Sequence, residues 1–199
     1  QAKKNHTAWV TGIPYWDVAK SHQVGSPLYY NSIMASGSDS SGLYKKQRLV
    51  PFGEYIPLSG LLSWVLPAMQ NDISMSGFTR GESDQKPLLI KGHALAAAIC
   101  YEVAYPNLTR RNAEDSDFLV TVSNDAWFTG TAGPWQHLQM VQMRAKENGR
   151  WFIRATNTGV TAFIDHQGHI VKRAPQDVAT VLRGELPAMQ GQTLYTRLS

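Results

Sequence analysis

The sequence predicts one domain of the α/β class, in which helices alternate with the strands of a sheet. Six segments rich in branched and aromatic residues have the composition of β-strands, and most are bounded by Gly, Pro, Asn or Asp. These strands are expected at residues 7–13, 28–35, 94–100, 118–123, 151–155 and 159–165. Helical signals separate the third, fourth and fifth of them. The order strand, helix, strand, helix, strand is typical of layered α/β folds, although it does not fix the order of strands in the sheet.

The stronger helical signal begins at Pro134 and ends before Gly149. Leu138, Val141 and Ala145 recur at helical spacing between them. Proline suits the first turn of a helix, and glycine suits the position just past its end. A helix is therefore expected between the strands at 118–123 and 151–155.

Weaker local signals complete the expected elements. A second helix is expected after Pro106, with Asn107 as its N-cap. Residues 160–164 and 169–172 are expected to form a hairpin whose turn contains Gly168, because such turns need a residue with positive φ. The Ser- and Gly-rich stretch at 36–42 is expected to be a turn.

The composition narrows the class of protein. The chain has 199 residues, 43% of them hydrophobic, which suits one globular domain with a sizeable core. Lys and Arg number 19 against 15 Asp and Glu, and this net charge of +4 is too small to indicate a nucleic-acid partner. No apolar run approaches the roughly 18 to 20 residues of a membrane-spanning helix, so a soluble or membrane-peripheral domain is expected.

The single cysteine, Cys100, stands where a strand is expected to end. An apolar run of small residues leads into Cys100, Tyr101 and Glu102, and Pro106 follows shortly afterwards. A thiol between a strand end and a helix start can face a cleft, where backbone N–H dipoles and a nearby cation favour the thiolate. The alternative is a buried, inert cysteine.

Five motifs then follow one another in a fixed order. They are Lys46 with Val50-Pro51-Phe52-Gly53-Glu54, Ala98-Ile99-Cys100-Tyr101-Glu102, Ser123-Asn124-Asp125-Ala126-Trp127-Phe128, Gly133-Pro134-Trp135-Gln136-His137 and Thr156-Asn157-Thr158-Gly159-Val160-Thr161. Together they resemble the apolipoprotein N-acyltransferase branch of the nitrilase, or carbon–nitrogen hydrolase, superfamily over nearly the whole chain. The resemblance implies a nitrilase-like four-layer αββα sandwich, incomplete at its N-terminus, with residues 1–199 forming one catalytic domain.

The resemblance also implies a Glu–Lys–Cys triad, in which the cysteine attacks a carbonyl, the lysine stabilises the oxyanion and the glutamate shuttles protons. The matching motifs place the nucleophile at Cys100 and the lysine at Lys46. Lys45 is the rival, but neighbouring residues of a strand face opposite sides, and the family spacing puts the lysine eight residues before Glu54. Glu54 is expected to hold the ammonium group. Solvent-exposed surface charges are the alternative for Lys46 and Glu54.

Further residues are expected to shape the pocket. Glu102 and Tyr101 flank the nucleophile and are expected to support the site. Asn124, Trp127 and Phe128 follow a strand, where ligand-binding loops gather, and are expected to form a pocket wall. Core packing is the alternative for the two aromatic residues. The six histidines show no metal-ligand spacing, so neither a metal nor a cofactor is expected.

The resemblance further implies the substrates. The cysteine would take a fatty acyl group from a phospholipid as a thioester, and would deliver it to the α-amine of the N-terminal diacylglyceryl-cysteine of a lipoprotein. The expected partners are therefore a phospholipid donor, a diacylated lipoprotein acceptor and a membrane surface, with no nucleic acid and a monomeric enzyme. The implied location is the bacterial inner membrane, with the catalytic domain on the periplasmic side.

A short apolar stretch offers a membrane contact. Residues 57–69 include Leu61, Leu62, Trp64 and Leu66 and are too few to span a bilayer. They could lie in the membrane interface, or pack in the core.

Two alternatives to this function stay open. One is a soluble nitrilase-like amidase, and the other is a catalytically silent module that binds lipid or a partner. In the resembled family the proton-shuttling glutamate belongs to a strand motif upstream of everything in this chain, and transmembrane helices flank the domain. The fragment as given is therefore expected to be inactive, with an unpaired sheet edge near Thr7.

Overall fold

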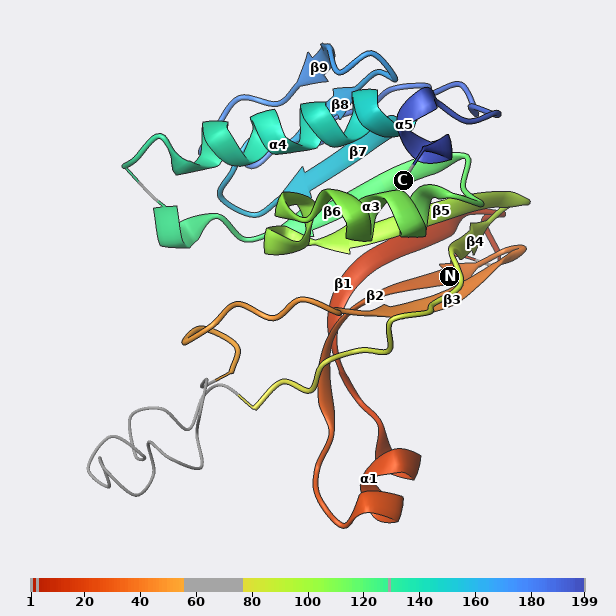
Figure 1. Cartoon of the computed structure of the whole chain (residues 1–199), viewed down its shortest axis with the longest axis vertical. Helices are drawn as coiled ribbons and strands as arrows, with labels where there is room; N and C mark the ends of the chain where they lie inside the picture. The colour runs from red at the N-terminus through yellow and green to blue at the C-terminus, as the bar shows by residue number, and fades with distance from the viewer. Residues whose placement is uncertain (1, 3, 56–76, 129, 199) are drawn as a thin grey trace.

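The computed structural model describes residues 2, 4–55, 77–128 and 130–198, and within them nine strands form one sheet in chain order (Figure 1). The strands are β1 (Ala8–Trp16), β2 (Tyr29–Gly37), β3 (Ser40–Lys45), β4 (Leu88–Ile90), β5 (His93–Ile99), β6 (Phe118–Ser123), β7 (Trp151–Thr156), β8 (Ala162–Ile164) and β9 (Ile170–Arg173). The helices are α1 (Val18–Val24), α3 (Pro106–Ala113), α4 (Gly133–Asn148) and α5 (Leu194–Arg197), with 3₁₀ turns η2 (Cys100–Ala104) and η3 (Ala126–Phe128).

The sheet has a parallel centre and antiparallel flanks. β5, β6 and β7 are parallel, and α3 and α4 make the two crossovers between them. β1 to β5 are joined by antiparallel pairings, as are β7 to β9. The expected alternation of strands and helices is confirmed at this parallel centre.

The sheet folds over itself, so that β1–β3 lie against β5 and β6 while α3 and α4 cover the opposite face of the central strands (Figure 1). Two hydrophobic cores fill the spaces between these layers. The core under the helices contains Ala96, Ala98, Val103, Ala113, Leu119, Leu138, Val141, Ala145, Phe152, Val160, Ala162 and Ile164. The core between the strand layers contains Ile33, Ala35, Tyr44, Leu88, Leu95, Ala97, Ile99 and Val120. The expected α/β layering is confirmed, and the described residues supply a helix layer and two strand layers.

The local signals explain where the central helices begin and end. α4 has proline in its first turn and ends at Gly149, which adopts a left-handed φ of 62°. Leu138, Val141 and Ala145 are all buried against the sheet, as expected. α3 begins at Pro106, and the prediction of an Asn107 cap is wrong. Proline at the first position already fixes the helical φ and has no N–H to satisfy.

The antiparallel part contains elements that the sequence patterns did not indicate. The 36–42 stretch was expected to be a turn, but it holds the end of β2, a tight turn at Asp39 and the start of β3. Gly42 lies inside β3, where its φ of 137° and the adjacent Leu88 leave no room for a Cβ. The expected hairpin is confirmed as β8 and β9, with Gly168 at φ 88° in its turn.

Candidate active site

The carboxyl ends of the parallel strands bring three motifs to one edge of the sheet. Cys100 follows β5, Asn124 follows β6 and Asn157 follows β7. The registers Ile99↔Val122 and Ser123↔Thr156 place these strand ends level with one another. Ligands of open α/β sheets bind outside this edge, so the candidate site lies here.

Cys100 occupies a strained position at the turn from β5 into η2. Its φ is 51°, which is uncommon for a residue with a side chain, and such conformations cost on the order of 1–3 kcal/mol. The thiol is free and the residue is partly exposed. A sharp strand-to-helix turn of this kind presents a nucleophile at the top of a sheet. Cys100 is therefore not a fully buried cysteine.

Lys46 follows the last residue of β3, and its side chain is only 2% exposed. Its Nζ lies 2.8 Å from Oε1 and 2.7 Å from Oε2 of Glu54. A buried ammonium group needs such a partner, because removing it from water is costly. The alternative of a solvent-exposed lysine is wrong.

Lys45 faces the other side of the strand. Its Nζ lies 3.0 Å from Oδ2 of Asp17 and 4.2 Å above the ring of Tyr30. The two adjacent lysines thus occupy different environments, as strand alternation predicts. Only Lys46 shares a carboxylate with the Phe-Gly-Glu motif.

Glu54 is fixed by three groups. Oε1 accepts a hydrogen bond from Nδ2 of Asn31 at 2.7 Å, and Oε2 accepts one from the backbone N–H of Val50 at 2.8 Å. The ion pair with Lys46 completes the set. Glu54 therefore holds the ammonium group in a defined place, and is not a free surface charge.

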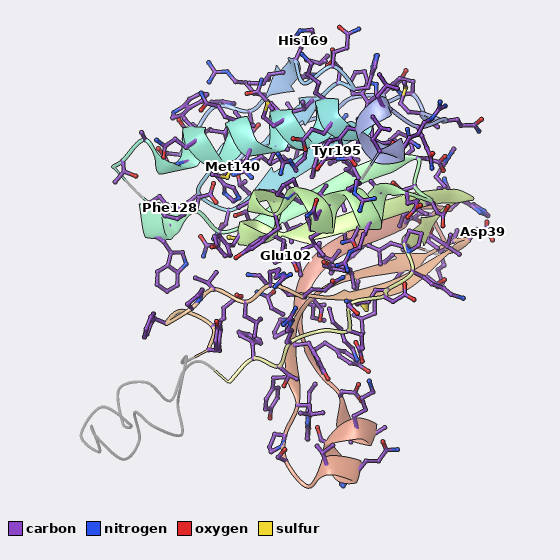
Figure 2. The ribbon with its side chains drawn as sticks, in the orientation of Figure 1. Asp39, Glu102, Phe128, Met140, His169 and Tyr195 are labelled. Carbon is purple, nitrogen blue, oxygen red and sulfur yellow. The ribbon has the colours of Figure 1, made fainter. Side chains whose placement is uncertain are left out.

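Glu102 is buried where the helix-covered strands face β1–β3 (Figure 2). Its Oε1 accepts hydrogen bonds from the backbone N–H groups of Gln47 at 2.6 Å and Arg48 at 3.0 Å. Oε2 accepts from the backbone N–H of Ile99 at 2.7 Å and from the hydroxyl of Tyr44 at 3.0 Å. One carboxylate therefore satisfies four donors.

These contacts connect the two principal motifs. Gln47 follows Lys46, and Ile99 precedes Cys100, so Glu102 ties the lysine segment to the nucleophile turn. Burial raises the pKa of Glu102, while the backbone hydrogen bonds and the charge of Lys46 act in the opposite direction. Glu102 contributes to the shape of the site from inside the fold.

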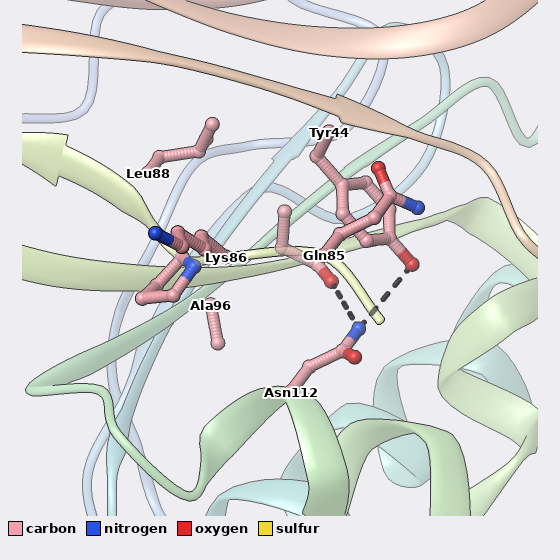
Figure 3. Close-up of a pocket in the computed structure, with 8 residues that line it drawn as sticks. Tyr44, Gln85, Lys86, Leu88, Ala96 and Asn112 are labelled. Carbon is pink, nitrogen blue, oxygen red and sulfur yellow. Dashed lines mark hydrogen bonds between the residues drawn. The ribbon is translucent and has the colours of Figure 1, made fainter. Parts of the chain in front are cut away.

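A small pocket lies behind Tyr44 (Figure 3). Nδ2 of Asn112, on α3, donates hydrogen bonds to the hydroxyl of Tyr44 at 3.3 Å and to the carbonyl of Ala97 at 3.1 Å. Neither Cys100 nor Lys46 lines this pocket. The hydrogen bond from Asn112 therefore steadies the hydroxyl of Tyr44, which in turn donates to Glu102.

A second buried network lies beneath Cys100, and its parts were not singled out as site residues from the sequence. Nε2 of His137 lies 3.0 Å from the carbonyl oxygen of Cys100, and Nδ1 lies 3.0 Å from Oδ1 of Asp125. Oδ2 of Asp125 accepts a hydrogen bond from Nη2 of Arg154 at 2.6 Å. His137 and Asp125 stood in two of the five motifs. Arg154 could have been noticed as a charged residue on the inward face of a strand, two residues after Phe152.

The other predicted pocket residues lie on the surface side of the site. Oδ1 of Asn124 accepts a hydrogen bond from Oγ1 of Thr158 at 3.2 Å, which joins the loops after β6 and β7. Tyr101 is 38% exposed, Trp127 79% and Phe128 44%. Figure 2 shows Phe128 beside the start of α4. Core packing of Trp127 and Phe128 is therefore wrong for this structure.

Three expectations concern membranes and metals. Leu61, Leu62, Trp64 and Leu66 lie at 56–76, outside the described residues. Among the helices that the structure describes, none has the length and apolar character needed to cross a bilayer. The described part of the chain also contains no cluster of three or more His, Cys, Asp or Glu side chains that could hold a metal ion.

The fold and this arrangement define the class of the protein. The model of the carbon–nitrogen hydrolase family matches residues 1–194, and the chain belongs to that family. Solved structures agree on the fold. The NitFhit protein of C. elegans superposes with a TM-score of 0.64 at 19% identity, covering 88% of this chain and 41% of that one. A carbon–nitrogen hydrolase from Helicobacter pylori G27 gives 0.61 at 18% identity, covering 87% and 59%.

The sequence is similar to a narrower group within the family. It is 50% identical over 196 residues to the apolipoprotein N-acyltransferase of Azotobacter vinelandii, and 49% identical over 194 residues to that of Pseudomonas paraeruginosa. Each match covers 98% of this chain and 37% of the relative. The resemblance to apolipoprotein N-acyltransferases is therefore confirmed, and the chain spans 37% of the length of these curated relatives.

Proposed function

We propose that the chain is the catalytic domain of a lipoprotein N-acyltransferase of the bacterial inner membrane, with its active site on the periplasmic side. It would move a fatty acyl group from a phospholipid, through a thioester on Cys100, to the α-amine of a diacylglyceryl-cysteine. The observation that carries this proposal is the junction made by Glu102, which joins the strained Cys100 turn to the segment of the buried Lys46–Glu54 pair. The 50% identity to an apolipoprotein N-acyltransferase supports the choice of these substrates.

The first half-reaction forms the acyl-enzyme. The thiolate of Cys100 attacks the ester carbonyl of the phospholipid, a C–S bond forms, and the carbonyl electron pair moves onto oxygen. The ammonium group of Lys46 stabilises this oxyanion, which is the kind of fixed charge that contributes most to such reactions. Collapse of the intermediate breaks the ester C–O bond, and the lysophospholipid leaves after its alkoxide takes a proton.

The second half-reaction transfers the acyl group. The uncharged α-amine attacks the thioester, a C–N bond forms, and the amine nitrogen loses a proton. Collapse breaks the C–S bond and regenerates the thiolate of Cys100. A thioester remains reactive toward an amine, provided that water is kept away from it between the two steps.

We assign the proton shuttle to a glutamate outside residues 1–199. Glu54 and Glu102 are the rival carboxylates, but both are engaged. Glu54 uses its two oxygens for Lys46, Asn31 and a backbone N–H, and Glu102 accepts four hydrogen bonds. A base must take and return protons at the reacting atoms, which a carboxylate committed to structural donors does poorly. This assignment also makes residues 1–199 alone inactive.

The surface near the site suits a lipid substrate. Phe52, Trp127 and Phe128 are 74%, 79% and 44% exposed. Trp is enriched at the membrane interface, and Phe joins it on the apolar face of segments that lie there. We place these side chains against the membrane together with the apolar stretch at 57–69, and we place the enzyme there as a monomer.

Mass measurement tests the acyl-enzyme. The polypeptide that contains this chain is incubated with phospholipid and analysed by intact and peptide mass. We expect one acyl adduct on Cys100, and we expect Cys100→Ser to keep the fold while turnover falls by at least about ten-thousandfold. Transfer to a diacylated lipopeptide amine should then exceed release of free fatty acid. An adduct on a serine would overturn the assignment of Cys100 as the nucleophile. Release of free fatty acid alone would favour an amidase-like hydrolase.

A further inference from the structure

The network beneath Cys100 has no role in the reaction as written above. Asp125 and Arg154 are 1% exposed and His137 is 7% exposed. They come from three separate segments: the loop after β6, helix α4 and strand β7. Burying three ionisable side chains together is costly unless each is paired, so the fold commits free energy to this arrangement.

The contacts of His137 run in two directions. The carbonyl oxygen of Cys100 can only accept, so Nε2 of His137 carries a proton and donates to it at 3.0 Å. The other nitrogen, Nδ1, lies 3.0 Å from Oδ1 of Asp125 and 3.3 Å from Nη2 of Arg154. The ring is therefore held from behind by a carboxylate and a guanidinium group while it holds the backbone of Cys100 in front.

Asp125 is fixed in turn. Ser123 donates its hydroxyl to Oδ1 at 2.6 Å, and Arg154 donates Nη2 to Oδ2 at 2.6 Å. Burial by itself raises the pKa of Asp125, but the hydrogen bonds from His137 and Ser123 and the charge of Arg154 outweigh it and hold the pKa below its ordinary value. The group is therefore an ionised acceptor at neutral pH.

The neighbouring loop is shaped around this carboxylate. A Cβ on Gly159 would collide with Oδ2 of Asp125, so only glycine leaves the space that the carboxylate fills. Nε of Arg154 donates to the carbonyl of Val160 at 3.0 Å, which ties the same loop to the network. The loop after β7 and the network therefore form one unit.

The backbone of Cys100 is where such support matters. Its φ of 51° is unfavourable for a residue with a side chain, and it persists only where surrounding contacts hold it. A hydrogen bond to the carbonyl of Cys100 fixes the peptide plane that follows the residue. Fixing that plane also constrains the direction of the Cα–Cβ bond, and hence the few rotamer positions that the thiol can take.

We propose that His137 is a positioning residue that holds Cys100 in its strained conformation through its carbonyl group, and that Asp125 and Arg154 orient the imidazole for this task. Its catalytic consequence rests on the proposed function, in which Cys100 is the nucleophile. The effect on the thiol itself does not depend on any acyl substrate.

Two substitutions of His137 separate positioning from mere packing. In His137→Gln the amide nitrogen falls close to the place of Nε2 and can still donate to Cys100. In His137→Asn the amide nitrogen falls close to the place of Nδ1, so the contact with Asp125 is kept and the contact with Cys100 is lost. Both variants lose one hydrogen bond, so both should have similar thermal midpoints.

The readouts are the rate of Cys100 alkylation by iodoacetamide and the single-turnover rate of acyl-enzyme formation, measured on the polypeptide that contains this chain. We expect His137→Asn to lower acyl-enzyme formation by about ten- to a hundredfold and to alter the alkylation rate, since misplacing a reacting group by about 1 Å can cost a hundredfold. We expect His137→Gln to stay within about threefold of the parent protein in both. His169→Asn is the matched control, because His169 also pairs with an aspartate, Asp165 at 3.2 Å, but lies on the surface.

Equal losses in the Asn and Gln variants at equal stability would overturn the proposal, as would unchanged rates in both. If alkylation follows the expected split while no variant and no parent protein forms an acyl-enzyme, the positioning role stands and the proposed acyl transfer fails. The two conclusions are therefore tested separately.

Discussion

Lys46 and Cys100 come from two parts of the sheet that hold their residues by different means. In the antiparallel part, Lys46 is fixed through its side chain by an ion pair with Glu54, only eight residues away in sequence. In the parallel part, Cys100 is fixed through its backbone by His137, thirty-seven residues away. The cation thus depends on a local loop, whereas the nucleophile depends on the packing of distant strands and a helix.

This difference separates function from stability. Removing Lys46 should have a large chemical consequence, and the backbone pairing of the strands around it should keep the sheet intact even though Glu54 loses its buried partner. The groups that surround Cys100 belong to the interior, so changes there should affect folding as well as chemistry. Glu102 lies between the two parts and should show both effects.

The largest effect is expected for Lys46→Ala. Loss of one oxyanion donor typically lowers the rate by about a hundred- to a thousandfold, and we expect this loss in acyl transfer. Lys45→Ala is the matched control: it removes the ion pair with Asp17 on the opposite face and should leave the rate within about threefold, while its thermal midpoint should fall because both side chains of that pair are largely buried. Transfer rates and thermal midpoints of both variants decide this. A large loss of rate in Lys45→Ala together with a small loss in Lys46→Ala would exchange the roles of the two lysines.

The parallel part was largely predictable from the sequence, whereas two strands of the antiparallel part, β3 and β4, were not. β6 was expected at 118–123 and occurs at Phe118–Ser123, because a continuous buried strand and flanking loop residues leave few alternatives. β4 has only three residues, and β3 begins with Ser40, Ser41 and Gly42, so neither carries a strand signal of its own. Their pairing with neighbours, not their composition, makes them strands.

The candidate site shows the same division. Cys100, Lys46 and Glu54 stand in motifs and could be named from sequence. The sequence indicated only that Glu102 supports the site, and not that it joins two segments. Three of its four donors lie more than fifty residues earlier in the chain, and the fourth is Ile99. Arg154 lies outside the five motifs, and its partner Asp125 is 29 residues earlier in the chain, so no local pattern connects the two. Long-range contacts of this kind leave no local pattern.

The next effect in size is expected for Glu102→Gln. The amide keeps the shape of the carboxylate, but its NH₂ group cannot accept, so two of the four donors lose their partner. Each unsatisfied buried donor costs about 1–3 kcal/mol, and we expect a loss of stability in that range or above it. Denaturant unfolding measures this change. The control is Glu82→Gln, since Glu82 pairs with Lys20 on the surface, and its loss should stay below about 1 kcal/mol. Equal losses for both variants would mean that Glu102 does not join the two parts.

The smallest effect concerns the pH dependence of stability through Asp125. Its pKa is lowered in the folded protein from an ordinary value of 3.8, despite burial, by His137, Ser123 and Arg154. A carboxyl group whose folded pKa is depressed contributes stability that is present above the unfolded pKa and lost as the pH falls through the folded value.

We therefore expect the difference in unfolding free energy between the parent protein and Asp125→Asn to be constant from about pH 7 to 5 and to shrink below about pH 4. Comparing each protein with its variant cancels the titration of all other carboxylates. Asp165→Asn is the control: burial raises the pKa of Asp165, but the backbone N–H groups of His169 and Gln167 lower it, and the side chain of His169, which lies on the surface where salt screens its charge, lowers it further. Added salt should therefore weaken the pH dependence for Asp165 and leave that for Asp125 nearly unchanged, since buried pairs are screened much less. A difference for Asp125 that does not change with pH would show that the buried network stabilises the parallel part by shape alone, without the charge of its carboxylate.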